Sequence, residues 1–103
     1  MPDAADRRRG QSDPRVALVR LIERLSRRRQ YVTFQDVERA AGRAGSRLPV
    51  DGLAGLVEGA VVESLLLKDL RTFFDRKTGA FSEHWVYRVN PRHPLALRVI
   101  SDD

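Results

Sequence analysis

Apolar residues in the first third of the chain recur every three or four positions, as they do on one face of an amphipathic helix. The pattern runs from Leu18 to Leu25. It is preceded by Asp13, a good N-cap residue, and by Pro14, which fits the first turn of a helix. The spacing therefore predicts a helix over residues 14–29.

A second helix is predicted for the segment FQDVERAAG, after a short extended piece at residues 31–33. Thr33 is placed to cap this helix, and Asp36 can complete a capping box. Gly42 is expected to end it in the left-handed conformation that glycine adopts readily. The residues expected to face the core are Val37, Ala40 and Ala41.

A third helix is expected to begin at Pro49 and to end at Gly59, after a turn at residues 43–47. Its buried face would consist of Val50, Leu53, Leu56 and Val57. Its outward face would consist of Asp51, Gly52, Ala54, Gly55 and Glu58. This outward face lacks the Arg, Lys, Asn and Gln side chains with which proteins usually read DNA bases.

The pattern changes from Ala60 onward, where a segment rich in Val, Leu and Phe, VVESLLLKDLRTFF, leads into a turn. A helix that continues to Leu70 is one interpretation. We favour a strand, because residues 75–79 carry a strong hairpin signal. Asp75 can accept a hydrogen bond from the turn backbone, and Gly79 can adopt a positive φ.

The returning strand is expected over residues 82–90, with side chains that alternate between two faces. Trp85 and Tyr87 fall on the same face, and their apolar neighbours favour packing in the core or hairpin over stacking on bases. Glu83 and His84 point to opposite faces, so they do not form a catalytic pair.

The composition predicts one globular domain and excludes several classes of site. The chain has 103 residues, 42% of them hydrophobic, which is enough to build a core. Without cysteine, and with two separated histidines, it is expected to contain no disulfide and no bound metal or other cofactor. No apolar run approaches the ~18 residues of a membrane span, and no signal peptide is recognisable. A cytoplasmic protein without a membrane partner is predicted.

The charge balance favours an acidic partner. The chain has 19 Lys and Arg residues against 14 Asp and Glu residues, and 17 of the 19 are Arg. Arg binds phosphate and carboxylate groups in a bidentate manner, although a GC-rich genome also favours Arg over Lys. The segment at residues 1–12 is a basic tail that we expect to be disordered, and it either aids solubility or contacts phosphate.

Three segments carry a resemblance to a known family: VTFQDVERAAG, LAGLVEGAVVES and WVYRVNPRHP. With the order of helices and hairpin, they resemble the winged helix-turn-helix superfamily over residues 14–92. The resemblance implies an α+β fold in which a three-helix bundle carries a C-terminal two-stranded β-hairpin, the wing. The domain would span residues 13–92, between the tail at 1–12 and a short C-terminal tail at 93–103.

In that superfamily the third helix usually lies in the DNA major groove, and the wing touches the backbone or the minor groove. The resemblance places Ser46 and Arg47 at or before the start of the recognition helix, and Arg76, Lys77 and Thr78 at the tip of the wing. Phosphate contacts are expected from Arg43, Arg47, Arg71, Arg76 and Lys77.

The resulting hypothesis is a small dimeric transcriptional regulator or nucleoid-associated factor that binds double-stranded DNA. The alternative is a winged-helix module that docks a protein partner on the small, acidic outward face of the third helix. An enzyme is not expected, because the sequence holds no nucleophile–base pair, glycine-rich phosphate loop or acidic metal cluster.

The homodimer is implied by the resemblance. Val16 and Val19, together with the apolar tail LALRVI, are available for a subunit interface, or they simply widen the core. His93, between Pro91 and Pro94, is expected to be an exposed loop residue.

Overall fold

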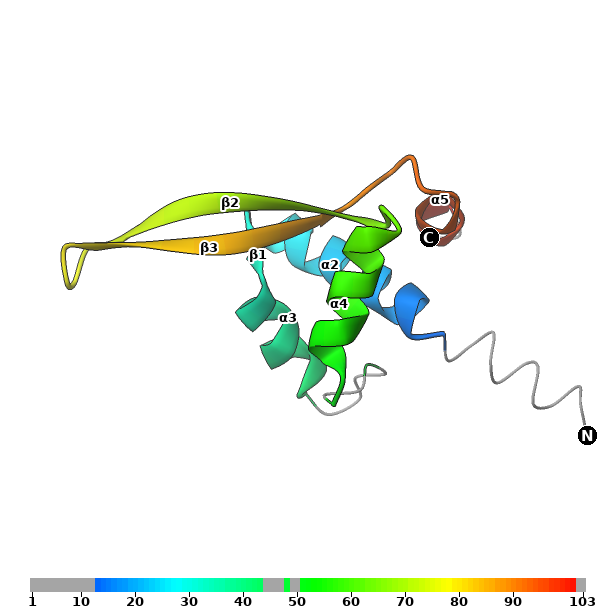
Figure 1. Ribbon diagram of the computed structural model, residues 1–103, viewed down its shortest axis with the longest axis horizontal. Helices are drawn as coiled ribbons and strands as arrows, with labels where there is room; N and C mark the ends of the chain where they lie inside the picture. The colour runs from blue at the N-terminus through cyan, green and yellow to red at the C-terminus, as the bar shows by residue number, and fades with distance from the viewer. Residues whose placement is uncertain (1–12, 44–47, 49–50, 102–103) are drawn as a thin grey trace, which may run out of the picture.

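The computed structural model describes residues 13–43, 48 and 51–101, and these fold into four helices and one three-stranded antiparallel sheet (Figure 1). The elements are α2 (Pro14–Arg28), β1 (Val32–Thr33), α3 (Phe34–Ala41), α4 (Leu53–Val62), β2 (Leu66–Asp75), β3 (Ala80–Val89) and α5 (Pro94–Ser101). The predicted α+β class is therefore confirmed. The predictions for residues 1–12, for Ser46 and Arg47, and for Pro49 and Val50 lie outside the described residues.

Helix α2 follows the sequence prediction to within one residue. The Asp13 carboxylate accepts a hydrogen bond from the Arg15 backbone N–H at 2.9 Å, and Pro14 occupies the first turn. Hydrogen bonding to Asp13 and its negative charge raise the pKa of the Arg15 guanidinium, so Arg15 stays charged. The buried residues of this helix are Leu18, Val19 and Ile22.

Helix α3 has the predicted capping box. Thr33 Oγ1 accepts a hydrogen bond from the Asp36 N–H at 3.3 Å, and Asp36 Oδ2 accepts one from the Thr33 N–H at 3.1 Å. Asp36 also pairs with Arg29 at 3.2 Å, which links the end of α2 to the start of α3. The predicted left-handed end is wrong, because Gly42 has φ −79° and ψ −5°, a right-handed conformation open to any residue. Val37, Ala40 and Ala41 are buried as predicted.

Helix α4 departs from the prediction at both ends. Its first residue is Leu53, after Gly52 adopts a positive φ of 78°. The helix continues past Gly59 to Val62, so the predicted end at Gly59 is wrong. Glycine costs a helix about 1 kcal/mol relative to Ala, and the next residue, Ala60, is buried in the core, which offsets part of that cost.

The chain reverses between α4 and β2 at Ser64, a non-glycine residue with φ 64°. This conformation costs roughly 1–2 kcal/mol. Two hydrogen bonds offset the cost: the Leu65 N–H donates to the Ala60 carbonyl at 2.8 Å, and the Asn90 side chain donates to the Ser64 carbonyl at 2.8 Å. The strand predicted from Ala60 onward is therefore wrong as far as Leu65 and correct from Leu66.

Strands β2 and β3 pair in one continuous register, from Leu66 opposite Val89 to Asp75 opposite Ala80. The short strand β1 lies on the other side of β3, where Val32 pairs with Tyr87. The predicted hairpin is confirmed, although its second strand begins at Ala80 rather than at residue 82.

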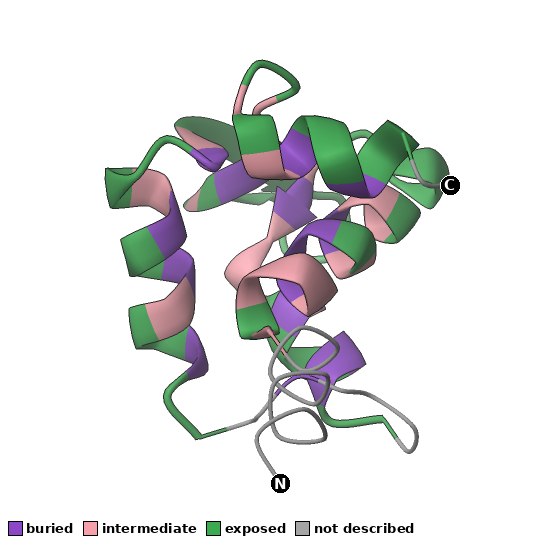
Figure 2. Ribbon diagram, turned by 90° about the vertical axis from the view of Figure 1, so that its right-hand side faces the viewer, coloured by how far each residue is buried: buried purple, intermediate pink, exposed green. Residues whose placement is uncertain are grey.

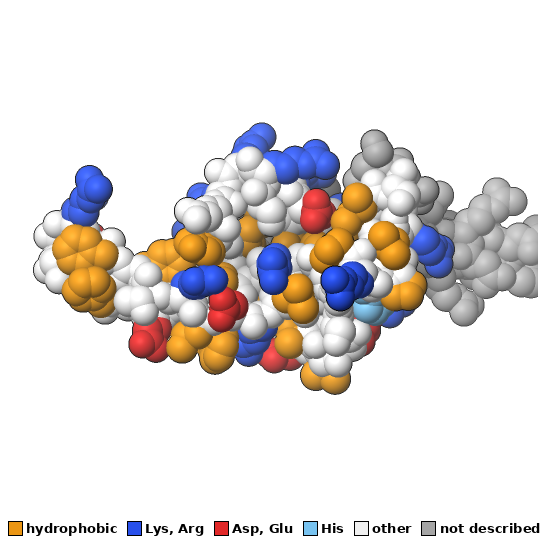
Figure 3. Space-filling view, turned by 90° about the horizontal axis from the view of Figure 1, so that it is seen from above, with side chains coloured by type: hydrophobic (Ala, Val, Ile, Leu, Met, Phe, Trp, Pro, Cys, Tyr) orange, Lys and Arg blue, Asp and Glu red, His pale blue; other side chains and the backbone are white. Residues whose placement is uncertain are grey.

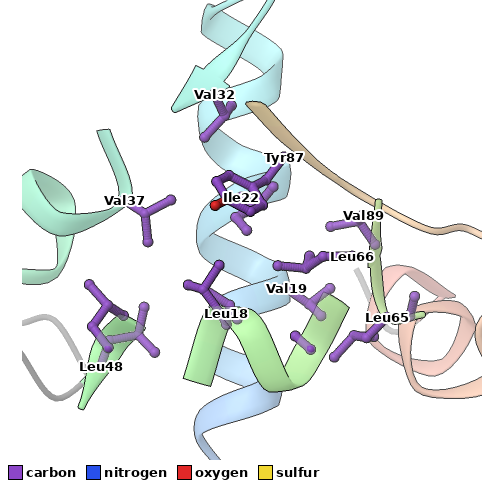
Figure 4. Packing of buried hydrophobic residues seen from close by; sticks show 14 of the residues in the cluster. Leu18, Val19, Ile22, Val32, Val37, Leu48, Leu65, Leu66, Tyr87 and Val89 are labelled. Carbon is purple, nitrogen blue, oxygen red and sulfur yellow. The ribbon is translucent and has the colours of Figure 1, made fainter. Parts of the chain in front are cut away.

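The core lies between the helices and the root of this sheet. Figure 4 shows Leu18 and Ile22 of α2 at its centre, with Val37 on one side and Leu66 and Val89 on the other. In Figure 2 the buried faces of the helices turn toward this interior. The sequence LALRVI forms most of α5, which packs on the core.

Val16 and Val19, which were considered for a subunit interface, instead pack in the core of their own chain. Val19 is fully buried there, and Val16 packs against the same cluster. Ala96 and Val99 of α5 are also buried in it. These contacts favour the interpretation in which the extra apolar residues widen the core.

His93 lies in the loop before α5 as predicted, but it is half-buried rather than exposed. Its Nδ1 atom accepts a hydrogen bond from the Leu95 N–H at 3.1 Å, which caps the start of α5. Its Nε2 atom lies 3.4 Å from the Glu63 carboxylate, which also pairs with Arg15 at 3.1 Å. Polar contacts thus connect the start of α2, the end of α4 and the start of α5.

Candidate nucleic-acid interface

The β2–β3 hairpin extends beyond the helices (Figure 1). Each strand has ten residues, which at ~3.4 Å per residue gives a ribbon about 34 Å long. The root is buried or half-buried at residues 66–68 and 86–87, whereas most side chains from Asp69 outward are exposed. The outer part of the ribbon is therefore available for contact with another molecule.

The turn at the tip is held by its own backbone and side chains, as the sequence predicts. The Asp75 carboxylate accepts a hydrogen bond from the Lys77 N–H at 2.9 Å. The Asp75 carbonyl accepts one from the Gly79 N–H at 2.8 Å, and Gly79 has φ 69°. These contacts fix the direction of the tip.

The tip presents two unpaired cations. Arg76 and Lys77 are exposed, and neither forms an ion pair with any described residue. Thr78 is exposed too, but its hydroxyl accepts a hydrogen bond from the Ala80 N–H at 3.2 Å and so helps to form the turn. Figure 3 shows Lys and Arg side chains beside hydrophobic ones at the end of the ribbon.

The other predicted contacts do not gather at the tip. Arg71 lies partway along β2, where it pairs with Asp69 at 3.0 Å. Arg43 is exposed just after α3, on the helical body rather than on the ribbon. Ser46 and Arg47 lie outside the described residues. The structure therefore brings together Arg76, Lys77 and Thr78 from the predicted set.

One face of the ribbon, which we call the covered face, lies against Tyr31. The Tyr31 ring makes an edge contact with Phe73 at a centroid distance of 5.9 Å, and Phe73 makes one with His84 at 5.5 Å. The Arg71 guanidinium lies 5.4 Å from the Tyr31 ring centroid. A groove of about 480 Å³ opens beside this cluster, with Gln30, Tyr31, Leu67, Asp69, Arg71 and Arg88 among its lining residues.

The opposite face, which we call the open face, carries two apolar cross-strand pairs: Leu70 opposite Trp85, and Phe74 opposite Phe81. The exposed fractions are 43% for Leu70, 48% for Trp85, 55% for Phe74 and 72% for Phe81. The rings of Phe74 and Phe81 lie 4.9 Å apart. Tyr87 is buried at the root of this face as predicted, whereas Trp85, two residues further out, is not part of the core.

Lys68 connects the open face to α4. Its ammonium group lies 4.6 Å from the Trp85 ring centroid and 3.1 Å from a carboxylate oxygen of Glu58. Glu58 belongs to the outward face of α4, whose predicted members Asp51, Gly52, Ala54, Gly55 and Glu58 are all exposed. Lys68 thus neutralises one of the two carboxylates on that face.

Sequence reasoning did not include the open face among the site residues. The alternation of β-strands does place Leu70 with Phe74, and Phe81 with Trp85, on one face. Alternation alone does not reveal where the strands leave the body, and this point decides which of those side chains are buried.

The described residues hold no group of three or more His, Cys, Asp or Glu side chains that would bind a metal ion. Among the helices that the structure describes, none has the length and apolar character needed to cross a bilayer. Comparison of the chain with models of known protein families, with curated proteins and with solved structures finds no match.

Proposed function

We propose that this chain is a winged-helix protein that binds double-stranded DNA, with the β2–β3 hairpin as a wing that contacts phosphate groups. The observation that carries the proposal is the pair Arg76 and Lys77, which are exposed and form no ion pair with the described residues, on a turn fixed by its own hydrogen bonds. Unpaired cations bind DNA phosphates without first breaking an ion pair. The order of helices α2, α3 and α4 followed by the hairpin also suits this fold.

The outward face of α4 carries less net negative charge than its sequence implies. Glu58 is neutralised by Lys68, which leaves Asp51 as the free carboxylate of that face among its described members. The face still lacks side chains that read bases. Phosphate contacts would then supply most of the affinity, as in a nucleoid-associated factor or a regulator of low sequence specificity.

The test is a titration of a labelled random-sequence duplex, followed by fluorescence anisotropy at several salt concentrations. Each phosphate contact contributes about 0.9 to the slope of log affinity against log salt, so R76A/K77A should lower the slope by about 1.8. The matched control is R92A/R98A, which removes the same charge from exposed positions near α5, at the opposite end of the molecule from the tip (Figure 1).

An unchanged slope in R76A/K77A, or an equal loss in R92A/R98A, would refute the role of the tip. The first result would mean that other groups hold the phosphates. The second would mean that net charge alone attracts the DNA.

A protein partner on α4 is the second candidate. Its outward face is formed by small residues, and Val62 at its end is 84% exposed. A Cβ atom added at Gly55 would meet nothing within 4 Å, so Gly55→Arg would place a large side chain on this face without disturbing the fold. Loss of a partner from Gly55→Arg in a pulldown, but not from Gly55→Ala, would support docking there. Retention by both variants would oppose it.

Self-association is proposed through the exposed side of α5. Leu97 and Ile100 are exposed there, while Ala96 and Val99 of the same helix are buried in the core. A dimer mass in light scattering that falls to the monomer mass in L97A/I100A would support this interface. A monomer mass for the unaltered chain would remove it.

A further inference from the structure

The open face of the ribbon carries two apolar and mostly aromatic cross-strand pairs, and no described residue lies over the outer one. On the covered face, Tyr31 contacts Phe73 at 5.9 Å. On the open face, Phe74 and Phe81 contact each other and remain largely exposed. Among the described residues, Tyr31 thus covers one aromatic face, and the outer part of the other face is left for a molecule from outside.

The charges around the open face favour a polyanion. Arg76 and Lys77 lie just beyond the last rung, Asp75 opposite Ala80, next to the Phe74–Phe81 pair, whereas the charge of Lys68 at the inner end is already paired with Glu58. Glu83, opposite Thr72, lies between the two apolar pairs and would repel a phosphate placed there. A polyanion would therefore place its phosphates near the tip and its uncharged parts on the rings.

We infer that the open face binds the unpaired bases of a single-stranded nucleic acid, with Phe81 and Phe74 as stacking platforms and the tip cations on its phosphates. Flat aromatic side chains stack on bases of any sequence, and flanking cations hold the backbone. In a duplex the base faces are already stacked on one another and cannot meet a flat surface. The inference rests on the proposed function, because both use Arg76 and Lys77, but it assigns a different ligand to a different set of side chains.

Trp85 provides a built-in probe of this site. It is the single tryptophan of the chain, and it lies on the open face opposite Leu70. Addition of an oligodeoxythymidine should therefore change the intrinsic fluorescence of the protein, and the change should saturate. The same titration with the random duplex should change the fluorescence much less.

Three substitutions at Phe81 separate stacking from simple apolar contact. Phe81→Ala removes the ring and should weaken binding of oligodeoxythymidine at least about fivefold. Phe81→Leu keeps an apolar side chain without a ring and should weaken binding in the same way. Phe81→Tyr keeps the ring and should retain the affinity. Because Phe81 is largely exposed, all three variants should fold, which thermal unfolding followed by circular dichroism checks.

The outcomes separate this inference from the proposed function. Duplex binding that depends on Arg76 and Lys77, together with weak oligodeoxythymidine binding or no effect of Phe81→Ala, would overturn the inference and leave the proposed function standing. Failure to bind either nucleic acid would overturn both. Full affinity in Phe81→Leu would also overturn the inference. A dimer mass that falls in Phe81→Ala would assign the open face to a second copy of the chain instead.

Discussion

The ammonium group of Lys68 lies over the ring of Trp85, 4.6 Å from its centroid. The same group pairs with Glu58 of α4 at 3.1 Å, so one side chain joins the body of the protein to the inner part of the open face. These two partners together restrict the rotation of the Lys68 side chain. Core packing of Leu66, Tyr87 and Val89 holds the root of the ribbon, and Lys68 adds a contact between α4 and the open face.

Replacement of Lys68 by Met should lower the free energy of unfolding by about 1 kcal/mol, because it removes the cation–π contact and the ion pair together. Glu58→Gln removes the ion pair alone, and at this exposed position it should cost less than about 0.5 kcal/mol. Urea denaturation of the two variants measures the difference. Equal losses in both would mean that the contact with Trp85 adds nothing to stability.

Substitution of Gly55 or Gly59 by Ala should stabilise the protein by about 0.5–1 kcal/mol each, since both lie inside α4 and an added Cβ atom meets nothing within 4 Å. Gly79→Ala is the contrasting case. At φ 69° an added side chain is strained, so this variant should be less stable by roughly 1 kcal/mol. Thermal unfolding at matched concentrations gives all three values. A loss of stability in Gly55→Ala would show that the face it occupies is not open.

Ionisation of the Tyr87 phenol makes the stability of the protein depend on pH in the alkaline range. Burial raises the pKa of its phenol above the ordinary value of 10.0, and the charge of Glu58 adds to this while that of Lys68 opposes it. The neutral phenol is thus favoured in the folded state. Its contribution to stability is complete below pH 10.0, and it is lost as the pH rises through the native pKa.

Tyr87→Phe should therefore flatten the fall of stability above about pH 10 and leave neutral stability nearly unchanged. Urea denaturation at neutral pH and at two alkaline values would compare the variant with the parent chain. Tyr31→Phe, at the other tyrosine of the chain, is the matched substitution to measure alongside it. Identical alkaline profiles for Tyr87→Phe and the parent would exclude the phenol as the source.

The features that the sequence predicted correctly depend on residues close together in the chain. Asp13 caps α2 through a contact two residues away, Thr33 and Asp36 form their capping box across one turn, and Asp75 and Gly79 build the hairpin tip. Such contacts follow from local backbone geometry and from the hydrogen-bonding capacity of each side chain.

The errors concern features that depend on the packed body. Gly59 carries a local signal for the end of a helix, yet α4 continues to Val62, and the residue after Gly59, Ala60, is buried in the core. Ser64 carries no signal for a positive φ, and its conformation depends on contacts with Ala60 and Asn90. The exposure of Trp85 is likewise a consequence of where the body ends. Of the candidate site, the tip cations could thus be predicted and the open face could not.

Because β2 and β3 pair in one continuous register, their cross-strand pairs can form in order from one end of the ribbon to the other. The rungs near the tip, such as Asp75 opposite Ala80, join residues that are neighbours in the chain, whereas the innermost rung joins Leu66 to Val89. Closing a short loop costs less entropy than closing a long one, so the ribbon can zip inward from its turn, on the ~1–10 μs scale of hairpins. The inner rungs then dock as the core forms. We therefore expect the end that carries Arg76 and Lys77 to be the first part of the sheet to form.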